Sequence, residues 1–262
     1  MTILFERRPS VSAIWARRLA IFSAVLLATS TAGHRFGLVA SIPFFWLLVI
    51  VAALAVCALL LAAFGFFRLW SHGDRGGRAS TRATLIAIVV LLPFAVGAYR
   101  AVTLPRLIDV STDTANPPSL LFAATDRTAG MNPVRPISAA DAALQAEAYP
   151  TLTGRRYTLT LDRMQELVVA VAGALDWRVA HNQQPLPDER AVTIEAVAPS
   201  PLFGLVSDVA IRIVDEGETT YVDMRSASRY GPHDLGDNAA KITRFFDALD
   251  ADIQARNTPP MQ

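Results

Sequence analysis

The fold is decided by residues 219–238, which read TTYVDMRSASRYGPHDLGDN. Polar and apolar side chains alternate at the start of this stretch, which predicts a β-strand over residues 219–228. Gly, Pro and Asp follow and favour a turn, and Asp234 then precedes an apolar helical pattern over residues 235–253 as its N-cap. We therefore predict a strand that leads through a polar turn into the last helix.

A second strand is predicted at residues 206–214, where polar and apolar side chains also alternate. A two-residue turn at residues 216–217 would pair the two strands as a hairpin and place Asp208 opposite Arg225. A slip by one residue would bury the charged side chains, so the faces are strongly specified. The apolar face then carries Val209, Ile211, Ile213, Val222 and Met224.

Further elements complete an α+β domain over residues 104–262. Apolar spacing predicts a helix at residues 161–175, and alternating patterns predict strands at 177–181 and 191–197. The result is an antiparallel sheet of about four strands flanked by two helices, both on the apolar face. Residues 101–150 are rich in turn formers and predict an extended lead-in over the domain surface, with one short helix at 139–148.

The first 103 residues are predicted to form a membrane region. Three apolar stretches occur there, at residues 18–34, 43–67 and 83–99. Because about 20 apolar residues span a hydrocarbon core, we predict three transmembrane helices. A cleaved signal peptide that ends near residue 32 is the alternative for the first stretch.

The placement of arginine predicts how these helices are oriented. Arginines cluster before the first helix and between the second and third, whereas the intervening loop has only Arg35. The positive-inside rule puts the N-terminus in the cytoplasm and the C-terminal domain in the periplasm of a bacterial inner membrane. The clustered residues are Arg7, Arg8, Arg17, Arg18, Arg68, Arg75, Arg78 and Arg82.

Composition excludes several classes of function. Residues 101–262 contain fourteen Lys and Arg against twenty-one Asp and Glu, which argues against nucleic-acid binding. Cys57 is the only cysteine, and the four histidines lack the spacing of metal ligands, so neither a metal site nor a cofactor is expected. A G-x-S-x-G elbow, a P-loop and a dinucleotide fingerprint are all absent from the sequence.

The charged sheet face and the turn after it hold the candidate site residues. Arg side chains and hydroxyls beside a helix N-terminus can bind a phosphate or carboxylate. The alternatives are cross-strand ion pairs on a solvated face, or a latch that holds the lead-in on the sheet. The candidate residues are Asp208, Arg212, Asp223, Arg225, Ser226, Ser228, Arg229 and Asp234, and Glu195 lies on the same face.

A hydrolytic triad can also be written from this stretch. Ser226 or Ser228 would be the nucleophile, His233 the base and Asp234 the orienting group. Triads are recognised by geometry and not by proximity in sequence, so this interpretation stays an alternative.

The same residues resemble a known family. The string VDMRSASRYGPHDLGDN at 222–238 is similar to the signature of domain-of-unknown-function family 1499, and the segments at 109–113, 194–196 and 207–212 fit as well. The resemblance covers about residues 104–249 and implies neither a substrate nor a catalytic residue. Members often carry two acids where this chain has Ser207-Asp208. Some members have N-terminal membrane helices, in agreement with the prediction above.

These observations lead to one functional hypothesis and two alternatives. We expect a membrane-anchored periplasmic domain that contacts the lipid bilayer and binds an envelope lipid, glycan or partner protein, without catalysis. The first alternative is a cell-envelope hydrolase or transferase that uses residues 225–234. The second makes the three helices part of a transport complex, although no charge within the membrane marks a pathway.

Overall fold

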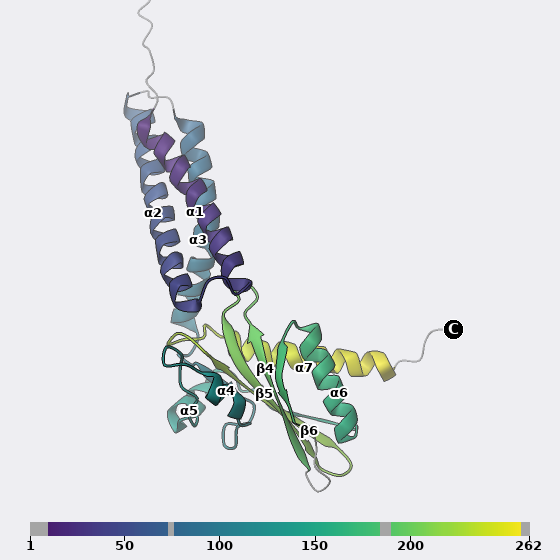
Figure 1. The fold of residues 1–262 in the computed structure, drawn as a ribbon. Coiled ribbons are helices and arrows are strands. Elements are labelled where there is room, and N and C mark those ends of the chain that lie inside the picture. Colours follow the sequence, from purple (N-terminus) through teal and green to yellow (C-terminus); the bar gives the residue numbers. More distant parts are fainter. Residues whose placement is uncertain (1–9, 73–75, 184–189, 258–262) are drawn as a thin grey trace, which may run out of the picture. The chain divides into compact units, whose positions relative to one another are not determined.

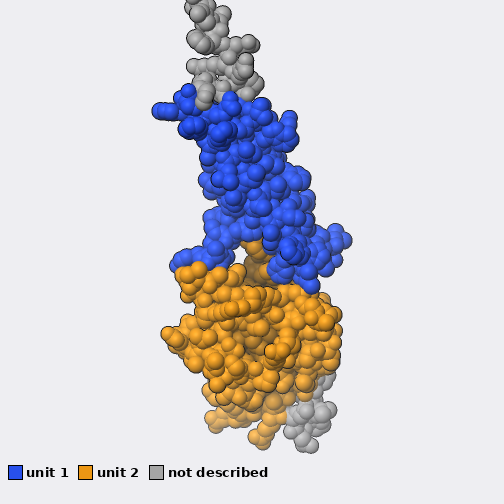
Figure 2. Space-filling model, turned by 90° about the vertical axis from the view of Figure 1, so that its left-hand side faces the viewer, with its two compact units in different colours: residues 1–99 blue, residues 100–262 orange. Residues whose placement is uncertain are grey.

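The computed structural model describes residues 10–72, 76–183 and 190–257. It divides into two compact units, Met1–Tyr99 and Arg100–Gln262, which Figure 2 colours separately. Parts of two predictions lie outside the described residues. These are most of the loop between the strands predicted at 177–181 and 191–197, and Arg7, Arg8 and Arg75 of the orientation argument.

The first unit consists of α1 (Val11–Arg35), α2 (Ser41–His72) and α3 (Gly77–Thr103), the last of which continues into the second unit. All three helices are long and apolar enough to cross a membrane. Each extends beyond its predicted apolar stretch, because hydropathy detects only the part of a helix suited to hydrocarbon and not the polar turns that continue it.

Small side chains fill the interior of the first unit. Gly65 on α2 shows how closely the helices approach, since a Cβ there would lie 2.6 Å from Ser80 Oγ of α3 and 3.4 Å from Ala13 Cβ of α1. Large apolar side chains point outward instead, as expected where the surroundings are as apolar as the interior. The buried residues of this cluster are Ala16, Ala20, Val51, Ala55, Ala58, Ala62, Ala83, Ala87 and Val90.

The second unit is built on a six-stranded antiparallel sheet of order β1-β6-β5-β4-β3, with β2 also paired to β6. The α+β class and the antiparallel sheet are therefore confirmed, and the sheet has two more strands than predicted. Both additional strands are short. The strands are β1 (Asp109–Ser111), β2 (Arg155–Tyr157), β3 (Arg178–Asn182), β4 (Ala191–Pro199), β5 (Val206–Asp215) and β6 (Thr220–Ser228).

The predicted register of the β5–β6 hairpin is wrong by two residues. Asp208 lies opposite Ala227 and not Arg225, and Arg212 lies opposite Asp223. The strand pairing ends at Asp215 and Thr220, and Glu216 N donates to Thr219 O at 2.9 Å, so the turn is centred on residues 217–218, one residue later than predicted. Because the shift is even, every side chain keeps its predicted face, and only the cross-strand partners change.

Two helices cover the apolar face of the sheet, α6 (Leu161–Ala174) and α7 (Asp237–Asn257) (Figure 1). Their large side chains form the core with the apolar face of the strands, and Phe245 stacks on Trp177 with ring centroids 5.7 Å apart. The buried residues of this core all lie between Leu107 and Leu249. A fragment of residues 104–262 therefore keeps the whole core and is expected to fold.

The last helix begins two residues later than predicted. Leu235 and Gly236 have positive φ angles of 56° and 77°, so neither adopts helical backbone. Gly236 is required for a second reason, because a Cβ there would lie 2.6 Å from Leu104 Cδ1. The helical spacing of apolar residues includes Leu235, so it gives no sign that Leu235 and Gly236 adopt left-handed backbone.

The lead-in covers the other face of the sheet with α4 (Leu121–Asp126), while α5 (Ala139–Ala148) lies at the sheet edge formed by β1 (Figure 1). The short helix predicted at 139–148 is confirmed, whereas α4 and β1 are additions to a segment predicted as extended. Gln145 of α5 binds the free edge of β1. Its amide donates to Ser111 O at 2.6 Å and accepts from Ser111 N at 3.0 Å, as a neighbouring strand would.

Candidate functional site

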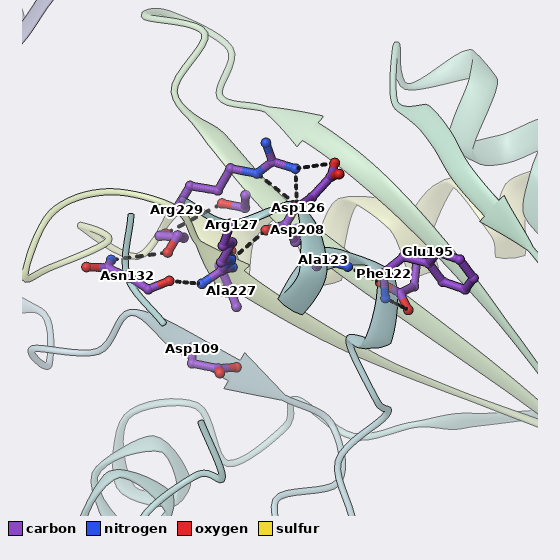
Figure 3. Close-up of polar contacts among 12 residues, drawn as sticks. Asp109, Phe122, Ala123, Asp126, Arg127, Asn132, Glu195, Asp208, Ala227 and Arg229 are labelled. Atoms are coloured by element: carbon purple, nitrogen blue, oxygen red, sulfur yellow. Dashed lines mark hydrogen bonds and ion pairs between the residues drawn. The ribbon is translucent and has the colours of Figure 1, made fainter. Parts of the chain in front are cut away.

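The charged face of the sheet is buried under the lead-in, and Glu195 of β4 makes one attachment (Figure 3). Its carboxylate accepts from Phe122 N at 3.0 Å and from Ala123 N at 2.9 Å, the first amides of α4. A carboxylate there satisfies N–H groups that have no partner within the helix. The ring of Phe122 also stacks on that of His181 of β3, with ring centroids 3.7 Å apart, so α4 contacts both β4 and β3.

Asp208 of β5 makes the strongest attachment, because it is 2 % exposed and pairs with two guanidinium groups. Arg127, just after α4, donates through Nε to Asp208 Oδ2 at 2.8 Å, and Arg229 donates to Oδ1 through Nε at 2.9 Å and Nη2 at 2.7 Å. Arg127 also donates to the carbonyls of Asn132 and Ala227 at 2.6 and 2.9 Å. This cluster joins the lead-in, β5 and the turn after β6.

Arg212 and Asp223 form the cross-strand pair that the corrected register brings together. The Nε of Arg212 donates to Asp223 Oδ1 at 3.0 Å, and its Nη2 donates to the carbonyl of Asn116 at 2.9 Å and to Asp113 Oδ2 at 3.4 Å. Burial raises the pKa of Asp223, and the neighbouring Arg212 opposes that rise. The pair therefore serves as a third attachment of the lead-in.

Arg225 holds the start of the lead-in to β6. Its Nε and Nη2 donate to the two oxygens of Asp109 at 3.0 and 2.7 Å, and Nη2 also donates to the carbonyl of Arg135 at 2.6 Å. Nη1 reaches the carbonyl of Pro118 at 3.4 Å. Lysine could not replace this planar group, because one ammonium cannot donate in all these directions.

Asn238, at the start of α7, connects the two serines of the motif. Its Oδ1 accepts from Ser226 Oγ at 2.8 Å, and its Nδ2 donates to Ser228 Oγ and to the carbonyl of Ile108, each at 3.0 Å. Asn238 is fully buried, so this amide uses its hydrogen-bonding capacity entirely within the protein. The serines therefore anchor α7 to β6 and to the lead-in.

Lys241 is the only lysine of the chain, and it is buried. Its Nζ donates to Ser207 Oγ at 3.0 Å and pairs with the carboxylate of Asp237. Burial lowers the pKa of Lys241. A serine beside such a lysine has the groups of a nucleophile and its base, but Ser207 is only 1 % exposed, which leaves a substrate no access to its hydroxyl. The pair instead joins β5 to α7.

Asp234 caps the turn into α7. One carboxylate oxygen accepts from Gly236 N at 2.9 Å and the other from Asn238 N at 3.1 Å. The His233 ring accepts from Leu235 N at 3.0 Å, so the hydrogen bonds of the described residues do not join this histidine to Ser226 or Ser228. The nucleophile–base contact of the hypothetical triad is thus not formed in this structure.

Asp234 is expected to make the domain less stable as the pH rises out of the acid range. Burial raises the pKa of Asp234, so the folded state binds this proton more tightly than the unfolded state does. Its contribution to the free energy of unfolding is fully present below the unfolded pKa of about 3.9 and is lost as the pH rises through the folded pKa.

Urea denaturation of the 104–262 fragment at successive pH values measures this contribution. The wild type should lose stability relative to Asp234→Asn as the pH rises, because Asn keeps a capping oxygen but does not titrate. Asp162→Asn removes an exposed acid from the first turn of α6 and is the matched control. Equal pH profiles for the wild type and Asp234→Asn would contradict the assignment.

In the structure the candidate residues do not form one open site. They take part in several separate contacts, most of which hold the lead-in on the sheet. Asp208 meets Arg229, Arg212 meets Asp223, Ser226 and Ser228 meet through Asn238, and Arg225 and Asp234 bind other partners. Their role in ligand binding stays a prediction. The sequence analysis did not identify Arg127, Lys241 and Asn238 as part of these polar contacts. The one signal that could have pointed to any of them is that Lys241 is the sole lysine of the chain.

A cleft of about 380 Å³ opens beside β1, between the lead-in and the turn before α7. Its walls include Arg106, Asp109, Arg135, Ile137, Asp141 and Pro232. Arg225 fixes two of these walls, since it binds the carboxylate of Asp109 and the carbonyl of Arg135. The cleft is therefore shaped by the motif, although sequence reasoning did not single out its lining.

The charged groups of the cleft are unequally neutralised. Arg225 neutralises Asp109, and Asp141 accepts from Ser138 Oγ at 2.8 Å. Arg106 donates only through Nε, to the carbonyl of Pro232 at 3.3 Å, and the Arg135 side chain makes no hydrogen bond or ion pair within the described part of the chain. The cleft thus presents two exposed guanidinium groups beside one carboxylate.

Metal coordination finds no support in the described ranges, where no group of three His, Cys, Asp or Glu side chains could hold an ion. No curated protein matches the sequence significantly. A family model, described as "Protein of unknown function (DUF1499)", matches residues 109–249. This range contains the whole sheet, α6 and most of α7, together with every candidate site residue. The chain therefore belongs to the DUF1499 family of proteins of unknown function.

Proposed function

We propose that this protein is a membrane-anchored binding protein whose α+β domain binds the phosphate-bearing headgroup of an envelope lipid in the cleft beside β1. The observation that carries the proposal is the exposed Arg135 guanidinium, which has no protein partner among the described residues and lies with Arg106 on the wall of a preformed cleft. Guanidinium groups bind phosphate oxygens through paired N–H donors.

The remaining charge of the cleft narrows the ligand class. With Asp109 neutralised by Arg225, Asp141 stands beside Arg106 and Arg135 as the one acid of the named lining that has no ion pair among the described residues. A phosphate would bind the arginines, and an ammonium group on the same headgroup would bind Asp141. The charges therefore favour a phosphoethanolamine-type headgroup over a purely anionic one.

Chain connectivity supports a lipid as the ligand. The third apolar helix ends at Thr103, and Arg106 follows three residues later. Three residues span at most about 11 Å, so this wall of the cleft is tethered close to the end of a membrane-spanning helix. Headgroups occupy the region just outside the hydrocarbon core.

The buried charges on the sheet have a positioning role in this proposal. Arg225 fixes Asp109 and the backbone of Arg135, while Asp208, Glu195 and Arg212 hold the rest of the lead-in. Catalysis is not part of the proposal, because Ser207, the serine beside the buried Lys241, is itself buried and lies outside the cleft lining.

The proposal places the domain in the periplasm of a bacterial inner membrane. Arg17 and Arg18 precede the apolar part of α1, and Arg78 and Arg82 precede that of α3, which supports a cytoplasmic N-terminus. A phosphatase reporter fused after Gln262 should be active and a fluorescent protein fused there dark, and the reverse would put the domain in the cytoplasm.

Replacing Arg135 should weaken headgroup binding by about ten- to a hundredfold. The full-length protein in detergent is titrated with dihexanoyl phosphatidylethanolamine, and binding is followed by phosphorus NMR line broadening. A hydrogen bond to a charged group contributes about 1.5–3 kcal/mol, so Arg135→Gln should reduce affinity by that order. Arg178→Gln is the matched control, because Arg178 is exposed on β3 at the opposite edge of the sheet.

Two further ligands separate the possible sources of the phosphate. Inorganic phosphate and dihexanoyl phosphatidylglycerol should both bind more weakly than the ethanolamine lipid. Equal binding by Arg135→Gln and the unaltered protein, or no binding of any phosphate compound, would contradict the proposal.

A further inference from the structure

The first unit contains arginines that take no part in the proposed headgroup cleft. Residues 10–72 and 76–99 include no Asp or Glu, and the acids of the first hundred residues, Glu6 and Asp74, lie outside the described part of the chain. Arg17, Arg18 and Arg82 therefore have no carboxylate partner among the described residues of this unit. A guanidinium at a membrane surface then takes its counter-charge from another molecule.

These arginines line a common hollow. The hollow has a volume of about 370 Å³ and is lined by Arg17, Arg18, Ile21, Arg82, Leu85 and Ile86, from α1 and α3. Because α2 reverses the chain direction between them, α1 and α3 run parallel, and the N-terminal ends of both helices lie at the same level.

Charge and apolar surface are layered within the hollow. Ile21 lies one helical turn after Arg17, and Leu85 and Ile86 lie one turn after Arg82, toward the middle of each helix. The arginines directly precede the apolar stretches that begin at Leu19 and Ala83. A charged layer at the membrane surface thus stands over an aliphatic layer about 5 Å deeper.

We infer that this hollow binds an anionic phospholipid, with phosphate on the arginines and one acyl chain along Ile21, Leu85 and Ile86. Basic pockets between transmembrane helices bind lipids that carry more than one phosphate, and the presence of Arg17, Arg18 and Arg82 favours a diphosphate lipid over a monophosphate one. Trp15 supports the charged layer, since the guanidinium of Arg18 lies 5.3 Å from the centre of its ring. This site is separate from the cleft of the α+β domain and does not depend on the proposed function.

Native mass spectrometry of the full-length protein in detergent tests the inference. Tetraoleoyl cardiolipin, dioleoyl phosphatidylglycerol and dioleoyl phosphatidylcholine are titrated separately, and we expect binding to decrease in that order. Arg82→Gln should weaken cardiolipin binding about fivefold, the effect of one basic residue near the surface. The matched control is Arg100→Gln, at the other end of the same helix, which should leave binding unchanged.

A second variant keeps every arginine in place. It distinguishes a specific lipid site from a general electrostatic attraction between the arginines and anionic lipids. Leu85→Trp fills the aliphatic layer without changing the charge or the orientation signal, and it should weaken cardiolipin binding by at least as much as Arg82→Gln. Unchanged binding by Leu85→Trp, or equal affinity of the unaltered protein and Arg82→Gln, would overturn the inference. Failure of the Arg135 experiment would leave it intact, since the two sites share no residue.

Discussion

Asp208→Asn is expected to lower the free energy of unfolding of the α+β domain by about 3–5 kcal/mol, the usual effect of removing one partner from a buried ion pair. The side chains of Arg127 and Asp208 are only 5 % and 3 % exposed, so this variant leaves a buried guanidinium without its counter-charge. Arg229 loses the same partner. Urea denaturation of residues 104–262, followed by the fluorescence of the buried Trp177, measures the loss.

Asp126→Asn is the matched control for this prediction. Asp126 approaches the same Arg229 at 4.0 Å, but its side chain is 69 % exposed, so the change should stay within about 0.5 kcal/mol. Lys241, as the only lysine, offers an independent readout, because Asp208→Asn should accelerate its acetylation. If Asp208→Asn lowers the free energy of unfolding no more than Asp126→Asn does, this cluster does not hold the lead-in on the sheet.

Lys241→Ala is expected to have an effect of similar size, about 3–5 kcal/mol, because it combines a cavity with the loss of a buried charge. Asp237 would lose its partner and Ser207 Oγ its donor. Lys241→Met should be less destabilising than Lys241→Ala, because its side chain fills most of the volume. The same denaturation experiment ranks the two variants.

A second i,i+4 ion pair on α7 supplies the control. Arg256 pairs with Asp252, but its side chain is 47 % exposed, so Arg256→Ala should change stability by less than about 1 kcal/mol. Equal losses for Lys241→Ala and Arg256→Ala would mean that burial of the lysine contributes nothing to the connection between β5 and α7.

Hydrophobic patterning predicts most of the fold of this chain. The three apolar helices are marked by long apolar runs, whereas the helix that becomes α6 and the long strands carry a clear periodicity. The short strands β1 and β2 do not, since three residues cannot establish an alternation. The predicted hairpin register is wrong because a shift by two residues leaves every side chain on its face. Only the turn geometry at residues 216–219 distinguishes the two pairings.

The candidate site is predictable in composition but not in connectivity. Alternation identifies Asp208, Arg212 and Asp223 as one charged face, and the structure brings all of them into ion pairs. Arg127, the partner of Asp208, and Asp109, the partner of Arg225, lie about a hundred residues away in a segment without periodicity, so the sequence offers no way to pair them. Burial of the charged face depends on those distant contacts, and the same contacts shape the cleft.

Photo-cross-linking from the cleft in native membranes is the most direct test of the proposal that this cleft faces lipid headgroups. Benzoylphenylalanine is introduced in place of Ile137 on the cleft wall, with Val89 on the exposed side of α3 as the positive control. Glu218, in the hairpin loop at the far end of β6, is the negative control. We expect phospholipid adducts from positions 137 and 89 and none from 218. Adducts from position 89 alone, or a protein adduct in place of lipid at position 137, would contradict the proposal.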